Sequence, residues 1–338
     1  MHEGRPKTWG LFGGAGFIGQ HLARSILNRY PEDRVTLLDL EADADCAWRV
    51  PIQSHFESGR LHLVHCDVRD GAQFETLQAK FDVIVNLAAV HREPGHRPKE
   101  YFDTNISGAR NLCAFASGTG CREIIFTSSI SVYGIHDRAV DESTAPEPYS
   151  PYGQSKLEAE QIHIDWAQET QGRLAIIRPG VVFGPGERGN VSRLVHEMLE
   201  RRRPISLKPD QPKAGIYIEE LIEVIHWLQA QEIPDSGYHL VNGVSNENLA
   251  FNAFGQALES LGRLPGKPLN IPAALVKAAS LVARPFAPLM PASSRLHPER
   301  LAKICRPNDV RATSLQSLGY PFAWPLPRAL EDWLARGL

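Results

Sequence analysis

TWGLFGGAGFIG, the sequence at residues 8–19, runs from an apolar segment through a glycine-rich turn into a helical pattern. It matches the spacing G-x-G-x-x-G from Gly14 and G-x-x-G-x-x-G from Gly13. Glycines permit a tight turn and a close approach of the backbone to a phosphate, and the N–H groups of a helix N-terminus bind that anion. Because an apolar strand precedes the motif and a helix follows it, the turn predicts a dinucleotide-binding βαβ unit. The residues expected to face the cofactor are Gly13, Gly16, Phe17, Ile18 and Gly19.

Short apolar runs alternate with longer segments of helical periodicity over the first two-thirds of the chain. This alternation is typical of βαβ units, which place parallel strands in one sheet with helices on both faces. We therefore predict an α/β fold with a Rossmann-type, doubly wound parallel sheet. The predicted strands are Thr8–Phe12, Val35–Leu38, Leu61–Val64, Val83–Leu87, Ile124–Thr127 and Leu174–Ile177. The predicted helices are Ile18–Tyr30, Ala72–Ala79, Tyr101–Ala116 and Pro151–Gln168.

The composition of the sequence changes after Pro179. Glycine and proline become frequent, and the regular alternation of apolar runs with helical segments stops. We expect an NAD-binding domain over residues 1–180 that carries the catalytic residues. A smaller, mostly helical substrate-binding cap is expected over residues 181–338, with some of its chain returning to the sheet. Predicted helices of this part are Glu219–Gln231, Leu249–Leu261, Ala273–Ala283 and Ala329–Arg336, with a strand at Tyr238–Val241.

Composition narrows the function classes without naming one. The 338 residues include 43% hydrophobic and 22% charged residues, as in an ordinary globular protein, and the net charge is −3. Such a charge gives no long-range attraction to nucleic acid or to an anionic membrane. Five scattered cysteines and the absence of ligand spacing among the histidines predict reduced thiols, a cytoplasmic protein and no metal site. The five are Cys46, Cys66, Cys113, Cys121 and Cys305.

The longest apolar run is Ala273–Met290, which Lys277, Arg284 and two prolines interrupt. It is therefore too broken to span a bilayer. Such a segment is able to line an apolar pocket or to touch a membrane surface. We favour a cap helix that faces the core.

Polar and small residues follow the predicted strands at the edge where ligands bind in open α/β sheets. Asp39 ends the second strand and suits the ribose hydroxyls of the adenosine, and its charge disfavours the extra phosphate of NADP. Asp67 and Val68 close the third strand and are candidates for the adenine, although a turn-capping role for Asp67 is nearly as well supported. The sequence Asn86-Leu87-Ala88-Ala89 ends the fourth strand, where small side chains leave space for a flat cofactor or simply for helix packing.

Tyr152 and Lys156 are four residues apart, so both lie on one face of the helix that begins at Pro151. An ammonium beside a phenol stabilises the phenolate and lowers the pKa of the tyrosine, which makes it a usable base near neutral pH. Ser129 follows the fifth strand and emerges at the same edge of the sheet, where its hydroxyl is able to bond a substrate oxygen. We therefore predict Ser129, Tyr152 and Lys156 as the catalytic residues.

These motifs together resemble the extended short-chain dehydrogenases/reductases, in the NAD-dependent epimerase/dehydratase branch. The resemblance covers residues 8–245. It rests on the glycine turn, Asp39, Asp67-Val68, Asn86-Leu87-Ala88-Ala89, Asn105-x-x-Gly108, Ser128-Ser129-x-x-Val132-Tyr133-Gly134, Ser150-Pro151-Tyr152-Gly153-x-Ser155-Lys156 and Arg178-Pro179-Gly180. It implies NAD as the cofactor, a homodimer, and transient oxidation of a nucleotide sugar at C4.

The resemblance also implies roles for single residues. Tyr152 matches the catalytic base, Lys156 the residue that lowers its pKa and holds the nicotinamide ribose, and Ser129 the catalytic serine. Asn105 matches the asparagine that orients the lysine or the cofactor, and Arg178 and Pro179 match the strand end beside the nicotinamide. Predicted substrate contacts are His91, Ser129, Ser131, Lys213 and Arg306, with an exposed loop as the alternative for His91. Lys213 and Arg306 are expected to contact a diphosphate.

Three departures from the family pattern restrict the function. Asn86 stands where histidine is frequent, and Gly180 stands where many nucleotide-sugar enzymes have an asparagine that contacts the diphosphate. Ile130 and Ser131 follow Ser129 in place of the acidic pair of the 4,6-dehydratases, which disfavours dehydration. The leading hypothesis is an NAD-dependent nucleotide-sugar 4-epimerase.

Other readings of the same motifs stay open. The alternatives are an NAD(P)H-dependent 4-ketosugar reductase and a hydroxysteroid-type dehydrogenase. A non-catalytic NAD sensor is disfavoured, because Ser129, Tyr152 and Lys156 are all present.

Overall fold

The computed structural model of the chain describes residues 5–41, 51–92, 95–208, 210–234, 237–247, 249–290, 298, 301 and 306–337. Its centre is a seven-stranded sheet in the order β10-β6-β5-β4-β1-β2-β3, in which every neighbouring pair is parallel. This is the predicted doubly wound sheet, since the order reverses between β1 and β4. The strands are β1 (Thr8–Phe12), β2 (Arg34–Asp39), β3 (Leu61–His65), β4 (Val83–Asn86), β5 (Glu123–Thr127), β6 (Arg173–Pro179) and β10 (Tyr238–Gly243).

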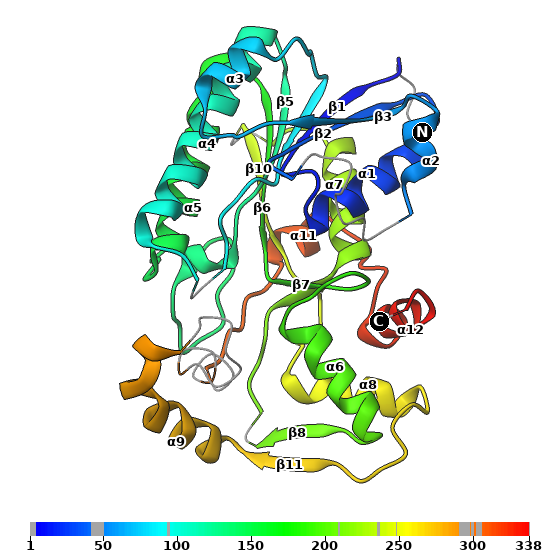
Figure 1. The fold of residues 1–338 in the computed structure, drawn as a ribbon, viewed down its shortest axis with the longest axis vertical. Helices are drawn as coiled ribbons and strands as arrows, with labels where there is room; N and C mark the ends of the chain where they lie inside the picture. Colours follow the sequence, from blue (N-terminus) through cyan, green and yellow to red (C-terminus); the bar gives the residue numbers. More distant parts are fainter. Residues whose placement is uncertain are drawn as a thin grey trace.

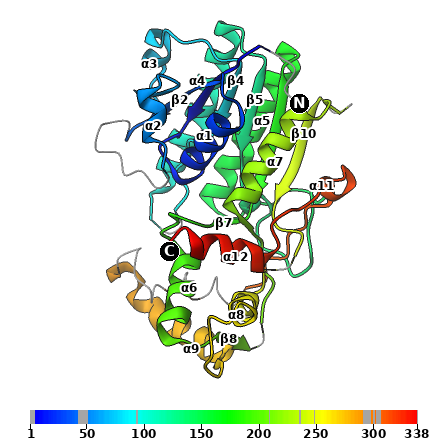
Figure 2. The same ribbon diagram turned by 90° about the vertical axis from the view of Figure 1, so that its right-hand side faces the viewer.

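Helices cover both faces of the sheet (Figures 1 and 2). One face carries α1 (Phe17–Arg29) and α7 (Ile218–Ala230), and the other carries α3 (Gly71–Thr76), α4 (Pro98–Thr119) and α5 (Pro151–Thr170). Alternate residues of β5 serve the two faces, because Ile125 packs in the cluster of α1 and α7 while Ile124 and Phe126 pack in the cluster of α4 and α5. The short helix α2 (Gln53–Glu57) precedes β3.

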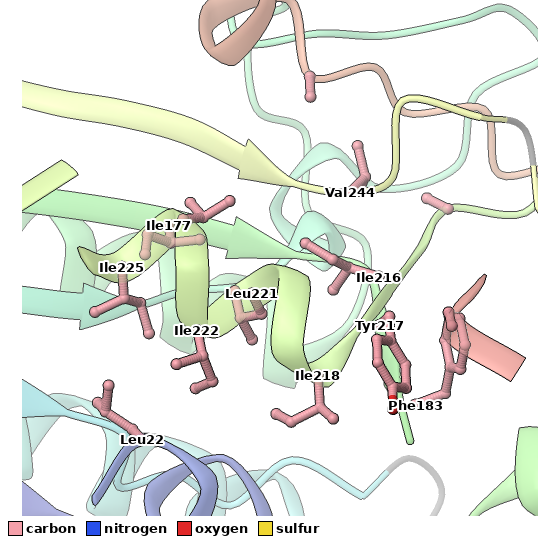
Figure 3. Close-up of a cluster of buried hydrophobic side chains, with 14 of the residues drawn as sticks. Leu22, Ile177, Phe183, Ile216, Tyr217, Ile218, Leu221, Ile222, Ile225 and Val244 are labelled. Atoms are coloured by element: carbon pink, nitrogen blue, oxygen red, sulfur yellow. The ribbon is translucent and has the colours of Figure 1, made fainter. Parts of the chain in front are cut away.

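Helix α7 packs on the large sheet, although it follows the first elements of the cap in the sequence. Leu221, Ile222 and Ile225 point into the space between the sheet and α1, where they meet Leu22 of α1 and Ile177 of β6 (Figure 3). All five side chains are at most 1% exposed. The chain therefore returns from the cap to the sheet over α7 and β10.

The remaining elements form the cap, which lies beyond the carboxyl ends of the strands (Figure 1). It contains two small parallel sheets, β7 (Val181–Phe183) with β9 (Gly215–Tyr217) and β8 (Ile205–Lys208) with β11 (Leu269–Pro272). The helical elements are α6 (Asn190–Arg201), α8 (Phe251–Ser260), α9 (Ala273–Ala283), η2 (Arg284–Leu289) and α12 (Leu326–Ala335). The exception is α11 (Thr313–Ser317), which packs on β10 of the large sheet (Figure 2). The prediction of a mostly helical cap missed these four strands and the helix α6.

Two further predictions need correction. The helix expected over Ala72–Ala79 ends at Thr76, because Leu77 leaves the helix with extended backbone angles. The helix Ala273–Ala283 has the predicted bounds but does not face the core, since Leu275, Leu281 and Val282 are exposed. Among the described residues, we find no helix that combines the length and apolarity needed to cross a bilayer.

The cysteines that the structure describes are buried free thiols, namely Cys66, Cys113 and Cys121. Burial raises the pKa of Cys66 to about 11 and that of Cys113 to about 12, so neither forms a thiolate at neutral pH. Cys46 and Cys305 lie outside the described residues.

Candidate active site

The glycine turn lies where the sheet reverses its order. Gly13 has φ +77°, and a Cβ atom there would lie 2.6 Å from the backbone nitrogen of Ala88, so the loops after β1 and β4 touch. The Asp39 carboxylate, at the end of β2, accepts a hydrogen bond from the backbone N–H of Ala15 at 3.0 Å. The ends of β1, β2 and β4 thus converge at the predicted cofactor site.

The N-terminus of α1 is suited to an anion. Its N-cap residue is Gly16, and no side chain among the described residues caps the helix. A Cβ at Gly19 would lie 2.4 Å from the carbonyl oxygen of Gly14, so the first turn of α1 packs tightly on the loop. Phe17, Ile18 and Gly19 form that first turn and present their N–H groups at its end. This uncapped helix end, beside Asp39, fits the diphosphate and ribose of a dinucleotide.

Asp67 and Val68 follow β3 and already have partners in the structure. The Asp67 carboxylate forms hydrogen bonds with the Arg69 guanidinium at 2.6–3.0 Å, and these bonds hold the pKa of Asp67 below its usual value. Val68 packs on α4, because a Cβ at Gly108 would lie 2.8 Å from its side chain. A contact of either residue with adenine stays a prediction.

The predicted catalytic turn, which carries Ser129, Tyr152 and Lys156, is built by three local contacts. Ser150 caps α5 by accepting a hydrogen bond from the backbone of Gly153 at 3.2 Å, which places Tyr152 and Lys156 in the first two turns. A Cβ at Gly153 would lie 2.4 Å from the carbonyl oxygen of Ser131, so η1 (Ile130–Tyr133) rests directly on this helix end. Ser129 caps η1, and its Oγ accepts a hydrogen bond from Ser131 N at 3.1 Å. The predicted Ser129 and Tyr152 therefore lie on two turns that touch.

Lys156 is 1% exposed, which is unusual for a lysine. Its Nζ lies 4.3 Å from the centre of the Phe126 ring, which in turn stacks on His163. Burial lowers the pKa of Lys156 to about 7, while the nearby Glu160 carboxylate acts in the opposite direction. An ammonium so poorly solvated gains from any negative charge that develops beside it.

Asn105 ties together the elements around the catalytic helix. Its side-chain NH₂ donates to Ser155 Oγ at 2.8 Å, and its Oδ1 accepts from the backbone of Val90 at 3.1 Å. Ser155 Oγ in turn donates to the carbonyl oxygen of Tyr152 at 2.8 Å. Asn105 thus fixes the turn between Tyr152 and Lys156 against the loop that follows β4, which supports the expected orienting role.

A buried ion pair behind the site escaped the sequence analysis. The Arg178 guanidinium, on β6, donates to both carboxylate oxygens of Glu160 at 2.9 and 2.6 Å, and to Tyr133 Oη at 2.9 Å. Tyr133 donates to Asn242 of β10 at 2.9 Å. The sequence contained one sign that Glu160 lies near the site. Tyr152, Lys156 and Glu160 follow one another at intervals of four residues, which places all three on one helix face. The Arg178 side chain therefore positions α5.

Lys213 and Arg306 are 93 residues apart in sequence and adjacent in the structure. Lys213 Nζ donates to the carbonyl oxygen of Arg306 at 2.6 Å, and Lys213 also forms a β-bridge with Asn308. Gly180 leaves no space for the asparagine of related enzymes, because a Cβ would lie 2.7 Å from the carbonyl oxygen of Ala214. His91 is exposed after β4. In the described part of the chain, no cluster of three His, Cys, Asp or Glu side chains suits a metal.

Comparison with known proteins places this site in a family. The model of the NAD dependent epimerase/dehydratase family matches residues 10–241. The chain belongs to this family. Its members use NAD, so this chain is an NAD-dependent enzyme of the extended short-chain dehydrogenase/reductase type, as the resemblance implied.

Two 4-epimerases are among the similar proteins. The chain is 27% identical over 326 residues to the N-acetyl-alpha-D-glucosaminyl-diphospho-ditrans,octacis-undecaprenol 4-epimerase of Escherichia coli O157:H7, covering 96% of this chain and 93% of that protein. It is 28% identical over 200 residues to UDP-arabinose 4-epimerase 1 of Arabidopsis thaliana, and spans about half of its length (47%).

Solved structures give the same fold. The UDP-glucuronic acid 4-epimerase of Bacillus cereus, in complex with UDP-glucuronic acid and NAD, superposes with a TM-score of 0.73 at 22% identity, covering 97% of this chain and 98% of that one. A crystal structure of a UDP-galactose 4-epimerase superposes with a TM-score of 0.69 at 20% identity, covering 98% and 99%.

Proposed function

We propose that this chain is an NAD-dependent nucleotide-sugar 4-epimerase that acts by transient oxidation of the sugar at C4. The observation that carries the proposal is the catalytic turn. Tyr152 and Lys156 lie one turn apart on α5, and the η1 turn that Ser129 caps rests on the same helix end. This arrangement provides a base, a buried cation beside it and a hydroxyl at the edge of the sheet where NAD binds.

Each residue then has a defined task. Tyr152, as the phenolate, takes the proton of the C4 hydroxyl, and the Lys156 ammonium stabilises that phenolate. The Ser129 hydroxyl donates a hydrogen bond to the C4 oxygen as the carbonyl forms. The glycine turn, the first turn of α1 and Asp39 would hold NAD, which would supply the hydride acceptor and donor for C4. After the 4-keto sugar has turned its other face, Tyr152 gives the proton back to the C4 oxygen, and the epimer leaves.

The substrate diphosphate requires cationic groups close to the site. A net charge of −3 means that the protein as a whole does not attract an anion, so local side chains must hold it. Lys213 and Arg306 are adjacent and are the candidates for this contact. Because Gly180 cannot be replaced by asparagine without a clash, the diphosphate depends here on cations rather than on an amide at that position.

A second candidate carrier is a polyprenyl diphosphate. The relative from Escherichia coli that matches almost the whole chain acts, by its name, on a sugar joined through a diphosphate to undecaprenol. Such a substrate shares the diphosphate and the hexose with a nucleotide sugar, so Tyr152, Lys156 and Ser129 would act identically on it. Only the group beyond the diphosphate differs.

The test is to incubate the purified enzyme with UDP-hexoses and with a polyprenyl-diphosphate hexose, without added cofactor, and to follow the C4 epimers by NMR. We expect interconversion without net change in NADH absorbance. Tyr152→Phe should lower turnover at least about 100-fold, as expected for loss of a general base. The matched variant Tyr149→Phe changes an exposed tyrosine three residues away and should keep full activity. Absence of the epimer without added cofactor, together with one NADH formed from added NAD for each sugar oxidised, would contradict the proposal and indicate a ketosugar reductase running in reverse.

The homodimer and the cytoplasmic location stay predictions. The sequence resemblance places the dimer contact on helices that include α5. Sedimentation velocity at micromolar concentration tests the dimer, and a single monomeric species would contradict it.

A further inference from the structure

Helix α9 exposes large apolar side chains and buries a polar one, which is the opposite of a surface helix in a typical soluble protein. Nine large apolar side chains are exposed among the described residues, and four of them lie between positions 275 and 286. They are Leu275 (63%), Leu281 (59%), Val282 (72%) and Phe286 (57%), and we call these four residues the α9 patch. Ser280, by contrast, is 5% exposed and donates a hydrogen bond to the carbonyl oxygen of Pro298 at 2.9 Å.

Packing against the protein core does not explain the apolar composition of α9. Among the described residues, its buried positions are Ala273 and Ser280, one small and one polar, and its core cluster consists of Ala273 and Leu207 with the partly buried Ile271 and Val276. A helix of a soluble protein normally buries its large apolar side chains and exposes its polar ones. In the part of the chain that the structure describes, nothing covers the α9 patch, and such a patch is typical of a contact with a partner.

The charge around the patch indicates the chemistry of that partner. The residues of α9 and η2, 273–289, include two basic residues, Lys277 and Arg284, and no aspartate or glutamate, although the whole chain carries a net charge of −3. Lys277 lies within α9 and Arg284 at its end, and both are exposed. Apolar side chains interleaved with exposed cations complement an anionic lipid surface, in which the apolar groups enter and the cations meet the headgroups.

We infer that α9 and η2 form a membrane-contact element, which lies in the interfacial region of an anionic bilayer. Both elements belong to the cap and lie beyond the carboxyl ends of the strands, on the side of the molecule that carries α4 and α5 (Figure 1). Docking through the α9 patch thus places the cap, and not the far end of the sheet, against the bilayer. This inference concerns where the enzyme works and is independent of the sugar carrier.

A second copy of the chain is the less suitable partner. A symmetric dimer through this face would set Lys277 and Arg284 of one copy near the same residues of the other. Neither α9 nor η2 contains an acidic residue to pair with them. An anionic bilayer has no such penalty, because each exposed cation gains there instead of being repelled.

The experiment is co-sedimentation of the NAD-loaded enzyme with two kinds of vesicle, phosphatidylcholine alone and phosphatidylcholine with about one-third phosphatidylglycerol. We expect binding to the anionic vesicles that weakens with added salt. Leu281→Ser/Val282→Ser should weaken binding at least about tenfold, because two exposed apolar anchors are lost. Lys277→Gln/Arg284→Gln should weaken it about fivefold per charge. Lys277→Arg/Arg284→Lys keeps both charges and should bind like the wild type.

The matched control is Ile135→Ser/Leu318→Ser, which removes two exposed apolar side chains outside the patch and should leave vesicle binding unchanged. The same samples are analysed by light scattering for oligomeric state and by NMR for epimerase turnover. Absence of binding to anionic vesicles, or equal binding by the control and the patch variant, would overturn the inference. So would an oligomer that Leu281→Ser/Val282→Ser dissociates, since the patch would then join copies of the chain. Loss of turnover with intact vesicle binding would count against the proposed function alone.

Discussion

Replacement of Lys156 by methionine should raise the stability of the folded protein and, in the same variant, abolish its activity. A pKa that falls from 10.5 to about 7 on burial corresponds to an unfavourable free energy of about 5 kcal/mol, at ~1.4 kcal/mol per pH unit. The contact of the ammonium with the Phe126 ring offsets about 1–2 kcal/mol of this. Methionine fills a similar volume without a charge. We therefore expect Lys156→Met to raise the free energy of unfolding by about 3 kcal/mol at pH 7.

The pH dependence of this gain follows from the direction of the pKa change. Below about pH 7 both the folded and the unfolded chain hold a protonated Lys156, and the full cost of burial is present. Between pH 7 and 10.5 the folded protein holds the neutral amine while the unfolded chain is still protonated, so the wild type gains stability as the pH rises. The advantage of Lys156→Met should therefore shrink toward zero by about pH 9.5.

The assay is urea denaturation of NAD-free protein at pH 7 and pH 9.5, with turnover measured in parallel. Turnover of Lys156→Met should fall at least about 100-fold, because the phenolate of Tyr152 loses its cation. Lys99→Met, on α4, removes a lysine that is 82% exposed and should change stability by less than about 0.5 kcal/mol at either pH. A methionine variant less stable than the wild type, or a gain that does not depend on pH, would refute this account of Lys156.

Three further predictions concern positions around the site. Glu160→Gln leaves the Arg178 guanidinium buried without its counter-ion and should cost about 3–5 kcal/mol of unfolding free energy in urea, whereas the exposed Glu158→Gln should cost almost nothing. Gly180→Asn drives a Cβ into the Ala214 carbonyl oxygen and should lower the melting temperature by several degrees, unlike Gly118→Asn, whose Cβ meets open space. Asp39→Asn removes a charge that repels the extra phosphate of NADP, so the preference for NAD in fluorescence titrations should fall about tenfold. An unchanged value in any of these measurements would contradict the role given to that residue.

The sheet was predictable because its signals are local. The strands β1 to β6 are predominantly apolar runs between polar segments, and each predicted strand agrees with the structure to within two residues at either end. The glycine turn and the pair Tyr152 and Lys156 are also local, since spacing alone determines which helix face they share. The strand β10, at Tyr238–Gly243, was also predictable from its local sequence. Its position beside β6 was not, because the two strands are far apart in the chain.

Long-range pairing explains most of what the sequence did not reveal. The partner of Arg178 is Glu160, on the preceding helix, and only the packing of α5 on β6 brings them together. The approach of Lys213 to Arg306 likewise depends on how the cap folds. Helix α9 has the apolar composition of a core helix, and nothing in its periodicity reveals that its large side chains face outward. Helix α6 carried a helical pattern at Val191, Leu194, Val195 and Met198 that the glycines before it obscured.

The central claim is that one enzyme-held NAD oxidises and reduces the same C4 atom. It is tested most directly with a sugar substrate that carries deuterium at C4, given to the enzyme without added cofactor. We predict that the C4 epimer forms with its deuterium retained and that NADH absorbance returns to its starting value when equilibrium is reached. Tyr152→Phe should give no epimer. Exchange of the deuterium for solvent hydrogen, or a 4-keto sugar formed in proportion to added NAD with no epimer, would contradict the claim.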